Sequence, residues 1–460
     1  MIQIDQALRP SDFAAALERL WSLSGAKLLS IEENTANQQG SPVFTSKGQY
    51  TSQGWTEWTQ GFQYGSAILQ YDATDDGAFL QIGRDRTRDL MASHVTHMGV
   101  HDHGFNNVST YGNLWRLMNE GRLTESAWER AFYELALKCS GAVQARRWSP
   151  TSCGSGFIHS FNGPHSLFAD TMRTLRALAL SWRLGHALMD EGDARINLLA
   201  RLVAHAKTTA RYAVYYGDGR DAYDTRGRVA HESIFNPADG QYRCASTQQG
   251  YSPFSTWTRG LAWVMLGYPE ELEFLDTVPD NDLANLGGRE EIVSVMTRAA
   301  RAACDFYLEH TPTNGVPYWD TGAPGLAHLE GWRDRPADPF NEHEPVDSSA
   351  AAIAAQGLLR LGRWLGQHGE DGDRYVQAGL TVMRTLLDEP YLATDPNHEG
   401  LLLHAVYHRP NGWDTVPDDA VVPCGEACMW GDYHLREAAL YIQRLAGEGP
   451  YLAFFGPEKS

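Results

Sequence analysis

Apolar residues recur at intervals of three to four positions through most of this 460-residue chain, which is the spacing of an amphipathic helix. Strand-like alternation is rare and short. With weaker segments near 58–70, 104–119 and 255–268 included, the pattern predicts about twelve helices. The clearest of them cover residues 12–21, 84–97, 124–148, 167–188, 193–214, 289–308, 348–365, 373–387 and 426–445.

About twelve helices joined by long loops favour an all-α (α/α)6 toroid, in which paired helical hairpins surround a funnel. No low-complexity linker divides the chain, so we expect a single toroidal domain over residues 51–460. Residues 1–50 are predicted to form an N-terminal helical extension that ends in a polar loop. The loops between the helices are rich in glycine and aromatic residues, and function on a helical scaffold usually lies in such loops.

The formal net charge is −19, and no basic run stands out. Nucleic-acid binders usually carry a basic patch, so we expect no nucleic-acid partner. The acidic balance also disfavours non-specific attraction to anionic polymers. An anionic ligand would therefore need Arg or His groups inside a local pocket.

The first 21 residues lack a basic region followed by an apolar one, which is the pattern of a signal peptide. No stretch approaches the ~20 apolar residues of a membrane span. We therefore expect no membrane partner and a cytoplasmic location, or a mature form whose signal is missing. Six cysteines lie far apart, which is not a disulfide framework. Cys424 and Cys428 lack further ligands at similar spacing, so we expect ordinary thiols rather than a zinc site.

Aromatic residues gather beside glycine in several predicted loops, including HDHGFNN, GVPYWD and PNGWD. Flat rings offer large apolar faces with polar edges. Sugar rings expose apolar C–H faces, so a cleft lined by Trp and Tyr suits a carbohydrate. The alternative is that these rings only seal the ends of helices.

Asp102 is the first carboxylate candidate, because it lies between His101 and His103 and precedes Gly104, which permits close backbone approach. Glycoside chemistry uses positioned carboxyl groups as acid, base or nucleophile. The equally weighted alternative is an Asp that only caps the following helix. The nearby histidines also allow a metal site, but hydrogen-bonded structure is the more usual role of such a loop.

Asp170 is the second carboxylate candidate, since it lies in an apolar stripe that predicts a helix over 167–188. A charge in such a stripe is costly unless it faces a cavity or a partner. In a partly dry funnel the pKa of the carboxyl would be raised, and the group could donate a proton. The alternative is an Asp turned to solvent or paired with Arg173 or Arg176.

Arg259 is the only cation in the aromatic segment 247–268, where Gln249, Trp257 and Trp263 surround it. An Arg beside aromatic rings suits recognition of a sugar carboxylate. The alternative is a structural Arg that binds loop carbonyls.

Seven segments together resemble the unsaturated glucuronyl hydrolases, glycoside hydrolase family 88, and they occur in the family's order. The resemblance spans about residues 55 to 440. The segments are WTQGF (58–62), HDHGF (101–105), ADTM (169–172), QGYS with STWTRGLAW (249–263), GVPYWD (315–320), DSSAAAIAAQGLL (347–359) and WGDYHLREA (430–438).

The resemblance implies an (α/α)6 hydrolase that needs no metal or other cofactor and cleaves unsaturated uronic acid from oligosaccharides left by polysaccharide lyases. It places the family's general acid/base at Asp170 and its second essential Asp at Asp102, with His101 adjacent. The implied mechanism is protonation of C4 of the C4=C5 double bond and attack of water on C5, after which the hemiketal opens and the glycosidic bond breaks. Positions that line the family's pocket correspond to Trp58, His231, Gln249, Trp257, Arg259 and Trp263.

The chain departs from the family's pattern at the edge of the expected pocket. Pro253 and Phe254 stand where acidic residues are common, Phe161 replaces a Trp, and His159 replaces an Arg. Phe161 keeps an aromatic surface for the sugar, but a positive charge near the substrate is lost. These departures bear on substrate identity more than on reaction type.

Other functions stay open on the residues alone. An (α/α)6 polysaccharide lyase, a saturated-uronate glycosidase or a sugar epimerase would use similar residue types, and the order of the motifs argues against them. A non-catalytic glycan-binding toroid would not need both Asp102 and Asp170. A helical scaffold for protein partners would not need the aromatic loops. The parent polysaccharide, the linkage and the oligomeric state are left open.

Overall fold

The computed structural model describes residues 1–35, 40–54, 58–124, 126–447, 449 and 453–455. Within them, outer and inner helical units alternate along the chain. The outer units are α1 (Ala14–Thr35), α3 (Gly77–Leu90), α7 (Ala127–Arg146), α10 (Leu198–Tyr212), α13 (Arg289–His310) and α15 (Asp373–Leu386). The inner units are α2 (Gln60–Thr74), α5 (His103–Asn107) with η2 (Val108–Gly112) and α6 (Asn113–Asn119), α8 (Thr171–Thr174) with α9 (Arg176–Arg183), α11 (Thr258–Leu275), α14 (Ser348–Gln367) and α16 (Met429–Ala446).

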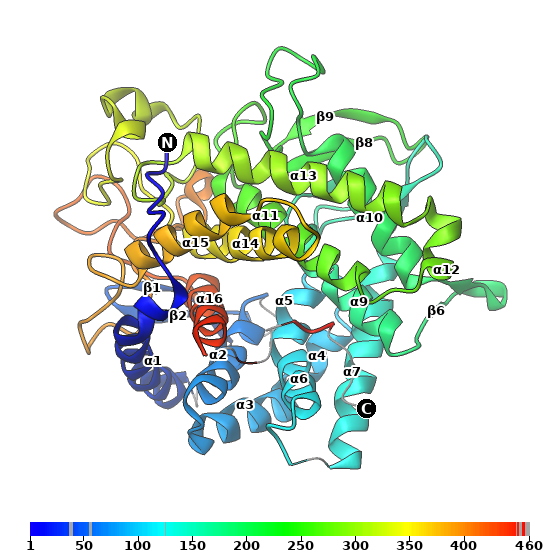
Figure 1. Ribbon diagram of the computed structural model, residues 1–460, viewed down its shortest axis with the longest axis horizontal. Coiled ribbons are helices and arrows are strands. Elements are labelled where there is room, and N and C mark those ends of the chain that lie inside the picture. Colours follow the sequence, from blue (N-terminus) through cyan, green and yellow to red (C-terminus); the bar gives the residue numbers. More distant parts are fainter. Residues whose placement is uncertain (36–39, 55–57, 125, 448, 450–452, 456–460) are drawn as a thin grey trace.

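The inner units close into a ring (Figure 1). In order around the ring, α2 contacts α5, α5 contacts α8, α8 contacts α11, α11 contacts α14, α14 contacts α16, and α16 returns to α2. The outer helices pack against this ring, for example α13 on α11 and α15 on α14. This alternation and closure confirm the predicted all-α (α/α)6 toroid.

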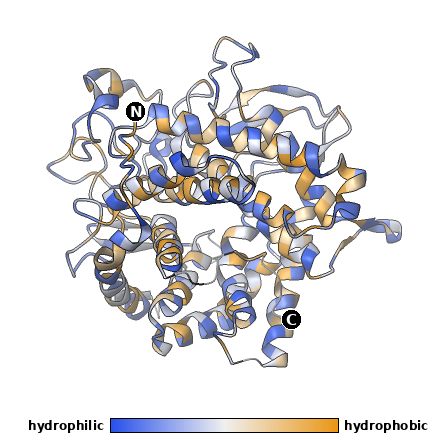
Figure 2. Cartoon of the chain, viewed as in Figure 1, coloured by the Kyte–Doolittle hydropathy of each residue, from blue (hydrophilic) through white to orange (hydrophobic). Residues whose placement is uncertain are grey.

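Position in the ring decides how each helix is buried. Every residue of α11 is buried, and most of α14 and α16 are too, because inner helices are covered on all sides. The outer α13 buries one stripe, including Ile292, Met296 and Ala299. Hydrophobic and hydrophilic residues alternate along the outer ribbons accordingly (Figure 2).

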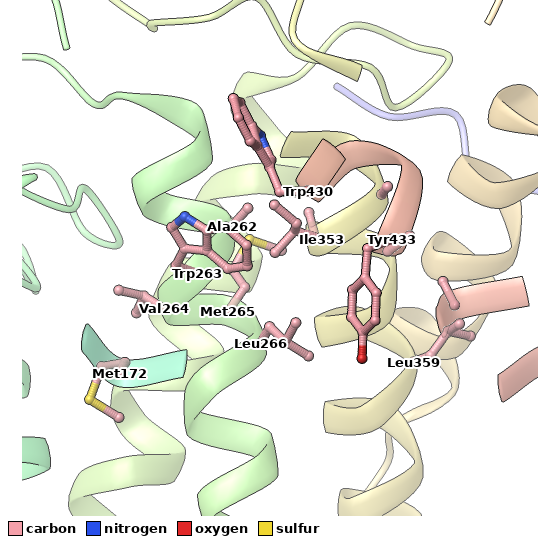
Figure 3. Packing of buried hydrophobic residues seen from close by; sticks show 14 of the residues in the cluster. Met172, Ala262, Trp263, Val264, Met265, Leu266, Ile353, Leu359, Trp430 and Tyr433 are labelled. Carbon is pink, nitrogen blue, oxygen red and sulfur yellow. The ribbon is translucent and has the colours of Figure 1, made fainter. Parts of the chain in front are cut away.

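The core continues across the ring of inner helices. Trp263 and Leu266 of α11, Ile353 of α14, and Trp430 and Tyr433 of α16 lie in the same buried cluster. Figure 3 shows these side chains from three helices in close proximity. Burial of such large side chains contributes roughly 1.5–3 kcal/mol each relative to exposure. Trp263 also lines a cavity at one end of the ring, so the core supports that cavity.

The inner helices also carry fully buried ion pairs. Arg173 of α8 lies 2.7 Å from Glu437 of α16, and Arg360 of α14 lies 2.7 Å from Glu273 of α11. Removing one partner of such a pair typically costs 3–5 kcal/mol, because it leaves an uncompensated buried charge. These pairs therefore fix inner helices relative to one another, α8 to α16 across the ring and α11 to its neighbour α14.

The segment 167–188, predicted as one helix, begins as a strand instead. Residues Ser166–Phe168 form β5, which pairs antiparallel with β8 (Glu232–Phe235), and β8 pairs with β9 (Tyr242–Ser246). The partner strand is some sixty residues away along the chain (Phe168 pairs with Glu232), so local periodicity could not reveal it. Helix α8 starts only at Thr171.

Short elements fill the connections. In the N-terminal segment, η1 (Pro10–Phe13) and α1 precede a hairpin of β1 (Ser41–Ser46) and β2 (Gln49–Gln53), where a polar loop was predicted. The remaining elements are α4 (Ala92–Val95), α12 (Asp280–Leu283), β3 (Trp148–Pro150), β4 (Gly156–Ile158), β6 (Leu188–Met189), β7 (Arg195–Ile196), η3 (Glu191–Asp193), η4 (Ala284–Leu286), η5 (Pro324–His328), η6 (Trp332–Asp334) and η7 (Arg409–Asn411). None of the helices described is long and apolar enough to cross a membrane.

Candidate active site

A cavity of about 380 Å³ opens among the inner helices and the loops that precede them. Nine of the ten predicted site residues line it, and the tenth, His231, lies directly behind its wall. The nine are Trp58, His101, Asp102, Phe161, Asp170, Gln249, Trp257, Arg259 and Trp263. Residues from widely separated segments therefore meet at one end of the toroid.

Asp102 immediately precedes α5, in the position of a helix cap. Its side chain makes no capping hydrogen bond, so the structural alternative does not account for the carboxylate. Only 7% of the residue is exposed. A Cβ at Gly104 would lie 2.4 Å from the carbonyl oxygen of Thr174, so the glycine lets α5 approach the end of α8 closely.

Asp170 lies at the junction of β5 and α8 and not inside a helix as predicted. It too precedes a helix without capping it through its side chain. Arg173 and Arg176, the alternative partners, face Glu270 and Glu437 instead. Asp170 is 7% exposed, and its buried Oδ1 has no hydrogen-bond partner among the described residues. The carboxylate is thus directed to the cavity.

His101 stands between the two carboxylates. Its Nε2 lies 3.5 Å from Oδ2 of Asp170 and 3.8 Å from Oδ1 of Asp102. Burial disfavours the charged imidazolium, but the charge of Asp102 and the interaction with Asp170 outweigh it, so the pKa of His101 is raised. The three groups lie close enough to shift one another's pKa, and we call them the Asp–His–Asp cluster.

The two carboxyl groups differ in the direction of their pKa shifts. Burial raises the pKa of Asp102, and the neighbouring Asp170 adds to that effect. Burial also acts on Asp170, but the hydrogen bond and charge of His101 outweigh it, so the pKa of Asp170 is lowered. We predicted a raised pKa at Asp170; that prediction was wrong because His101 stabilises the ionised form.

The rings of two other histidines in this segment, His94 and His103, are held by hydrogen bonds. His94 Nε2 lies 2.7 Å from the side-chain oxygen of Gln60. His103 lies 3.0 Å from Ser140 Oγ and 3.0 Å from the carbonyl oxygen of His97. Across the described residues, no group of three or more His, Cys, Asp or Glu side chains is placed to hold a metal ion. These contacts agree with a structural role for the histidine-rich loop.

His231 supports the wall that Gln249 lines. Its Nδ1 accepts hydrogen bonds from the backbone N–H groups of Gln248 and Gln249 at 3.1 and 3.3 Å. Its ring packs between Phe168 and Trp257, each centroid 4.5 Å away. Burial lowers its pKa to about 4, so His231 accepts these bonds as a neutral imidazole near pH 7. It shapes the loop from behind the wall.

Arg259 connects three parts of the cavity wall. Its guanidinium lies 2.9 Å from Asp347 Oδ2 and donates to Gln249 Oε1 at 2.9 Å. It also donates to the carbonyl oxygens of Val406 and Tyr407. These contacts favour the structural alternative for Arg259, which nevertheless brings a positive charge to the cavity surface.

Aromatic rings form much of the remaining wall. Trp58 stacks on Trp430 with centroids 4.9 Å apart, and Trp263 packs against Phe105 at 4.7 Å. The ring of Phe161 stacks over His101 at 6.1 Å and an angle of 16°. The predicted aromatic lining is therefore present around the Asp–His–Asp cluster.

Eight lining residues were not among the predicted site residues, and three of the eight are Tyr407, His408 and Trp413. These three belong to an irregular loop between α15 and α16, where periodicity offers no signal. The glycine and aromatic pattern in PNGWD was the available signal for Trp413. The carboxylate of Asp414 accepts hydrogen bonds from the backbone N–H groups of Tyr407 and His408, and so holds this loop together.

Phe254 and His159, two of the residues at which the sequence departs from the family's pattern, lie in different surroundings. Phe254 stacks on Tyr223 with centroids 4.2 Å apart and does not line the cavity. His159 Nδ1 lies 3.2 Å from Ser149 Oγ, and burial lowers the pKa of this imidazole to about 4. His159 is therefore neutral near pH 7, so the positive charge expected of an Arg is absent at this position.

The chain is similar over most of its length to characterised enzymes. It is 28% identical over 401 residues to the unsaturated glucuronyl hydrolase of Bacillus sp. strain GL1, covering 85% of this chain and 87% of the relative. It is 27% identical over 407 residues to the unsaturated chondroitin disaccharide hydrolase of Streptococcus pyogenes serotype M1, covering 86% and 84%. The chain is a homologue of the unsaturated glucuronyl hydrolases.

The fold agrees with this relationship. The crystal structure of the unsaturated glucuronyl hydrolase of Bacillus sp. GL1 matches with a TM-score of 0.70 at 23% identity, covering 95% of this chain and 100% of that one. No protein-family model matches the chain. The whole toroid, and not an isolated segment, is therefore shared with unsaturated glucuronyl hydrolases.

Proposed function

We propose that this chain is a glycoside hydrolase that releases Δ4,5-unsaturated uronic acid from oligosaccharides produced by polysaccharide lyases. The observation that carries the proposal is the Asp–His–Asp cluster at the base of an aromatic cavity. The names of the relatives support it, since one is an unsaturated glucuronyl hydrolase and another an unsaturated chondroitin disaccharide hydrolase.

The chemistry needs one proton and one water. The C4=C5 bond of the substrate is a vinyl ether, so a proton added to C4 leaves an oxocarbenium-like centre at C5. Asp170 donates that proton, and water attacks C5 as its own proton returns to the carboxylate. The product is a hemiketal that opens by breaking its bond to the ring oxygen. The resulting hemiacetal at C1 then releases the leaving sugar, so one water is consumed overall.

Asp170 must be protonated to begin this cycle, although His101 favours its ionised form. A bound uronate brings a second negative charge and expels water from the cavity. Both effects raise the pKa of a neighbouring carboxyl. Substrate binding therefore prepares Asp170 as an acid, with His101 and Asp102 beside it.

The remaining cavity residues have binding roles in this proposal. Trp58, Trp257 and Trp263 offer apolar faces to the sugar ring, and Phe161 covers His101. Gln249 and Arg259 provide polar and positive groups for the uronate carboxylate, with Gln249 supported by His231. The mechanism uses a proton and a water, and no cofactor takes part.

The same proposal covers the partner, the location and the domain organisation of the enzyme. The partner is the unsaturated oligosaccharide, and the net charge of −19 argues against nucleic acid. A cytoplasmic location is supported by six cysteines that are all unpaired, because disulfides are rare in that compartment. Residues 51–460 form the catalytic domain in this proposal, and residues 1–50 are an N-terminal extension whose helix α1 completes the outer ring of the toroid.

A matched pair of disaccharides tests the reaction. One carries Δ4,5-unsaturated glucuronic acid at its non-reducing end and the other carries saturated glucuronic acid on the same leaving sugar. The expected result is release of the leaving sugar from the unsaturated compound alone, because only its double bond can be protonated and hydrated. Release from the saturated compound would instead identify an ordinary uronate glycosidase.

A further inference from the structure

Arg147 lies beside two loops of the candidate site, directly after α7 and before β3. Strand β3 pairs antiparallel with β4, and the backbone N–H of His159 donates to the carbonyl oxygen of Arg147 at 2.9 Å. This pairing brings the loop of residues 159–161 next to the Arg147 side chain. The half-buried guanidinium does not line the cavity itself, but it contacts the segment that carries the cavity-lining Phe161.

The guanidinium of Arg147 joins the two loops through backbone carbonyl oxygens. Its Nε donates to His159 at 3.0 Å and its Nη2 to Ser160 at 2.6 Å. Its Nη1 donates to Met98, which belongs to the loop that supplies two members of the Asp–His–Asp cluster. A planar guanidinium presents its donors in fixed directions, which an ammonium group does not. Arg147 therefore fixes the loop of the cluster against the loop of Phe161.

The two loops meet at the stack of Phe161 on His101, with ring centroids 6.1 Å apart and an angle of 16°. Phe168 of β5 closes a third side, with its centroid 5.5 Å from that of Phe161 and 5.6 Å from that of His101. Because His101 belongs to one loop and Phe161 to the other, movement of either loop would displace the imidazole from its place between the two carboxylates. The bridge made by Arg147 prevents that movement.

Arg147 also brings a positive charge close to the Asp–His–Asp cluster. Among the residues that the structure describes, its guanidinium hydrogen-bonds to carbonyl oxygens and to no carboxylate. Burial and the neighbouring Asp170 raise the pKa of Asp102, whereas His101, Arg147 and His97 act in the opposite direction. At His101, burial and Arg147 lower the pKa, while the two carboxylates raise it. The charge of Arg147 thus favours an ionised Asp102 beside a neutral His101.

We propose that Arg147 is a positioning residue, which fixes the loop of His101 and Asp102 against the loop of Phe161 and holds a positive charge beside the Asp–His–Asp cluster. The effect on turnover rests on the proposed function, whereas the effect on the protonation of His101 does not. The positive charge that the side chain at position 159 does not supply is thereby provided by Arg147, whose Nε binds the carbonyl oxygen of that residue.

Titration of His101 tests the charge of Arg147 and needs no substrate. In protein with labelled histidine rings, the His101 signal is followed by nuclear magnetic resonance and assigned by its loss in His101→Gln. Arg147→Met removes the charge, so the titration midpoint of His101 should move to higher pH by about half a pH unit or more. Arg147→Lys keeps the charge, so its midpoint should stay near that of the parent protein. An unchanged midpoint in Arg147→Met, or an equal rise in both variants, would contradict the inference.

Turnover of a Δ4,5-unsaturated disaccharide tests the geometry. Arg147→Lys keeps the charge but cannot bridge the carbonyl oxygens as the planar guanidinium does, so kcat should fall by about tenfold with KM little changed. Arg147→Met loses both properties, and its kcat should fall by about a hundredfold. Its profile of kcat/KM against pH should also move to higher pH, because the pKa values of His101 and Asp102 both rise when the positive charge is removed.

Arg228→Met is the matched control, because Arg228 also donates to the backbone carbonyl oxygens of three residues and does not line the cavity. The three residues are Tyr223, Pro253 and Ser255. This variant should leave the His101 midpoint and the pH profile of the parent protein unchanged. Equal changes of the pH profile in Arg147→Met and Arg228→Met, or an unchanged kcat in both Arg147 variants, would overturn the inference and leave the proposed function intact. Absence of turnover in the folded parent protein would overturn the proposed function and the catalytic part of this inference, whereas the His101 midpoints test the charge of Arg147 in either case.

Discussion

His101 Nε2 lies 3.5 Å from the carboxylate of Asp170 and 3.8 Å from that of Asp102, so one buried imidazole joins the two acids of the cavity. This relationship explains why the two carboxyl groups have pKa values shifted in opposite directions although both are buried. Similar groups in different surroundings can therefore take different parts in one reaction.

Replacing Asp170 by Asn should nearly abolish turnover, because the amide has no proton of suitable acidity for C4. We expect kcat to fall by about a thousandfold or more, within the range of lost acid–base catalysis. The helical circular dichroism spectrum and the unfolding midpoint should stay close to those of the parent protein. A folded Asp170→Asn variant that retains activity would remove Asp170 from the proposed role.

Replacing Asp347 by Asn should weaken substrate binding more than chemistry. The Asn keeps the hydrogen-bonding pattern that caps α14 but removes the charge that holds Arg259. We expect KM to rise by about tenfold or more, together with a loss of stability of about 3 kcal/mol.

Glu273→Gln is the matched control for that experiment, since Glu273 pairs with Arg360 in the core at 2.7 Å. It should lose similar stability while KM stays unchanged. If both variants change KM equally, the effect of Asp347 is one of general stability and not of Arg259 placement.

Acid should destabilise the fold well before the carboxylates titrate. Burial lowers the pKa of His103, His205 and His434 to about 3, below their usual value of 6.5. Between those values the unfolded chain binds protons that the folded chain does not, so stability present above pH 6.5 is lost as the pH falls. Each such histidine removes up to about 1.4 kcal/mol per pH unit. Urea unfolding at pH 7 and pH 5 measures this, and equal stabilities would contradict it.

Metal removal should leave the enzyme unaffected. The proposed steps use only a proton and a water, and the histidines near the cavity bond to Gln60, Ser140 and a backbone carbonyl. Activity after treatment with a chelator such as EDTA should equal that of the untreated protein. A loss of activity that zinc or calcium restores would show that the reaction needs a metal ion.

Helical spacing allowed the toroid to be predicted, because most helices have one apolar stripe or are apolar throughout. The prediction from helical spacing failed near Asp170, where pairing of β5 with the distant β8 replaces the first turn of the expected helix. Local sequence does not encode such a partner, so the position of Asp170 before α8 needed the structure. Asp170 nevertheless lines the cavity, where it directly precedes α8.

The residues that form the candidate site were predicted more completely than the directions of their pKa shifts. Nine of the ten predicted site residues line the cavity, because the family resemblance had marked them as positions of one pocket. The pKa directions depend on the distances from His101 to two carboxylates, which no sequence pattern contains. The engagement of Arg259 by Asp347 and the contribution of the loop with Trp413 likewise arise from contacts between distant segments.

Loss of the ultraviolet absorbance of a Δ4,5-unsaturated uronyl disaccharide, measured together with release of its leaving sugar, tests the proposed hydration most directly. We expect purified protein to remove the absorbance of disaccharides in a lyase-generated panel, one leaving sugar appearing for each double bond lost, and we expect Asp170→Asn to do neither. Folded parent protein that leaves the absorbance of the whole panel unchanged would contradict it.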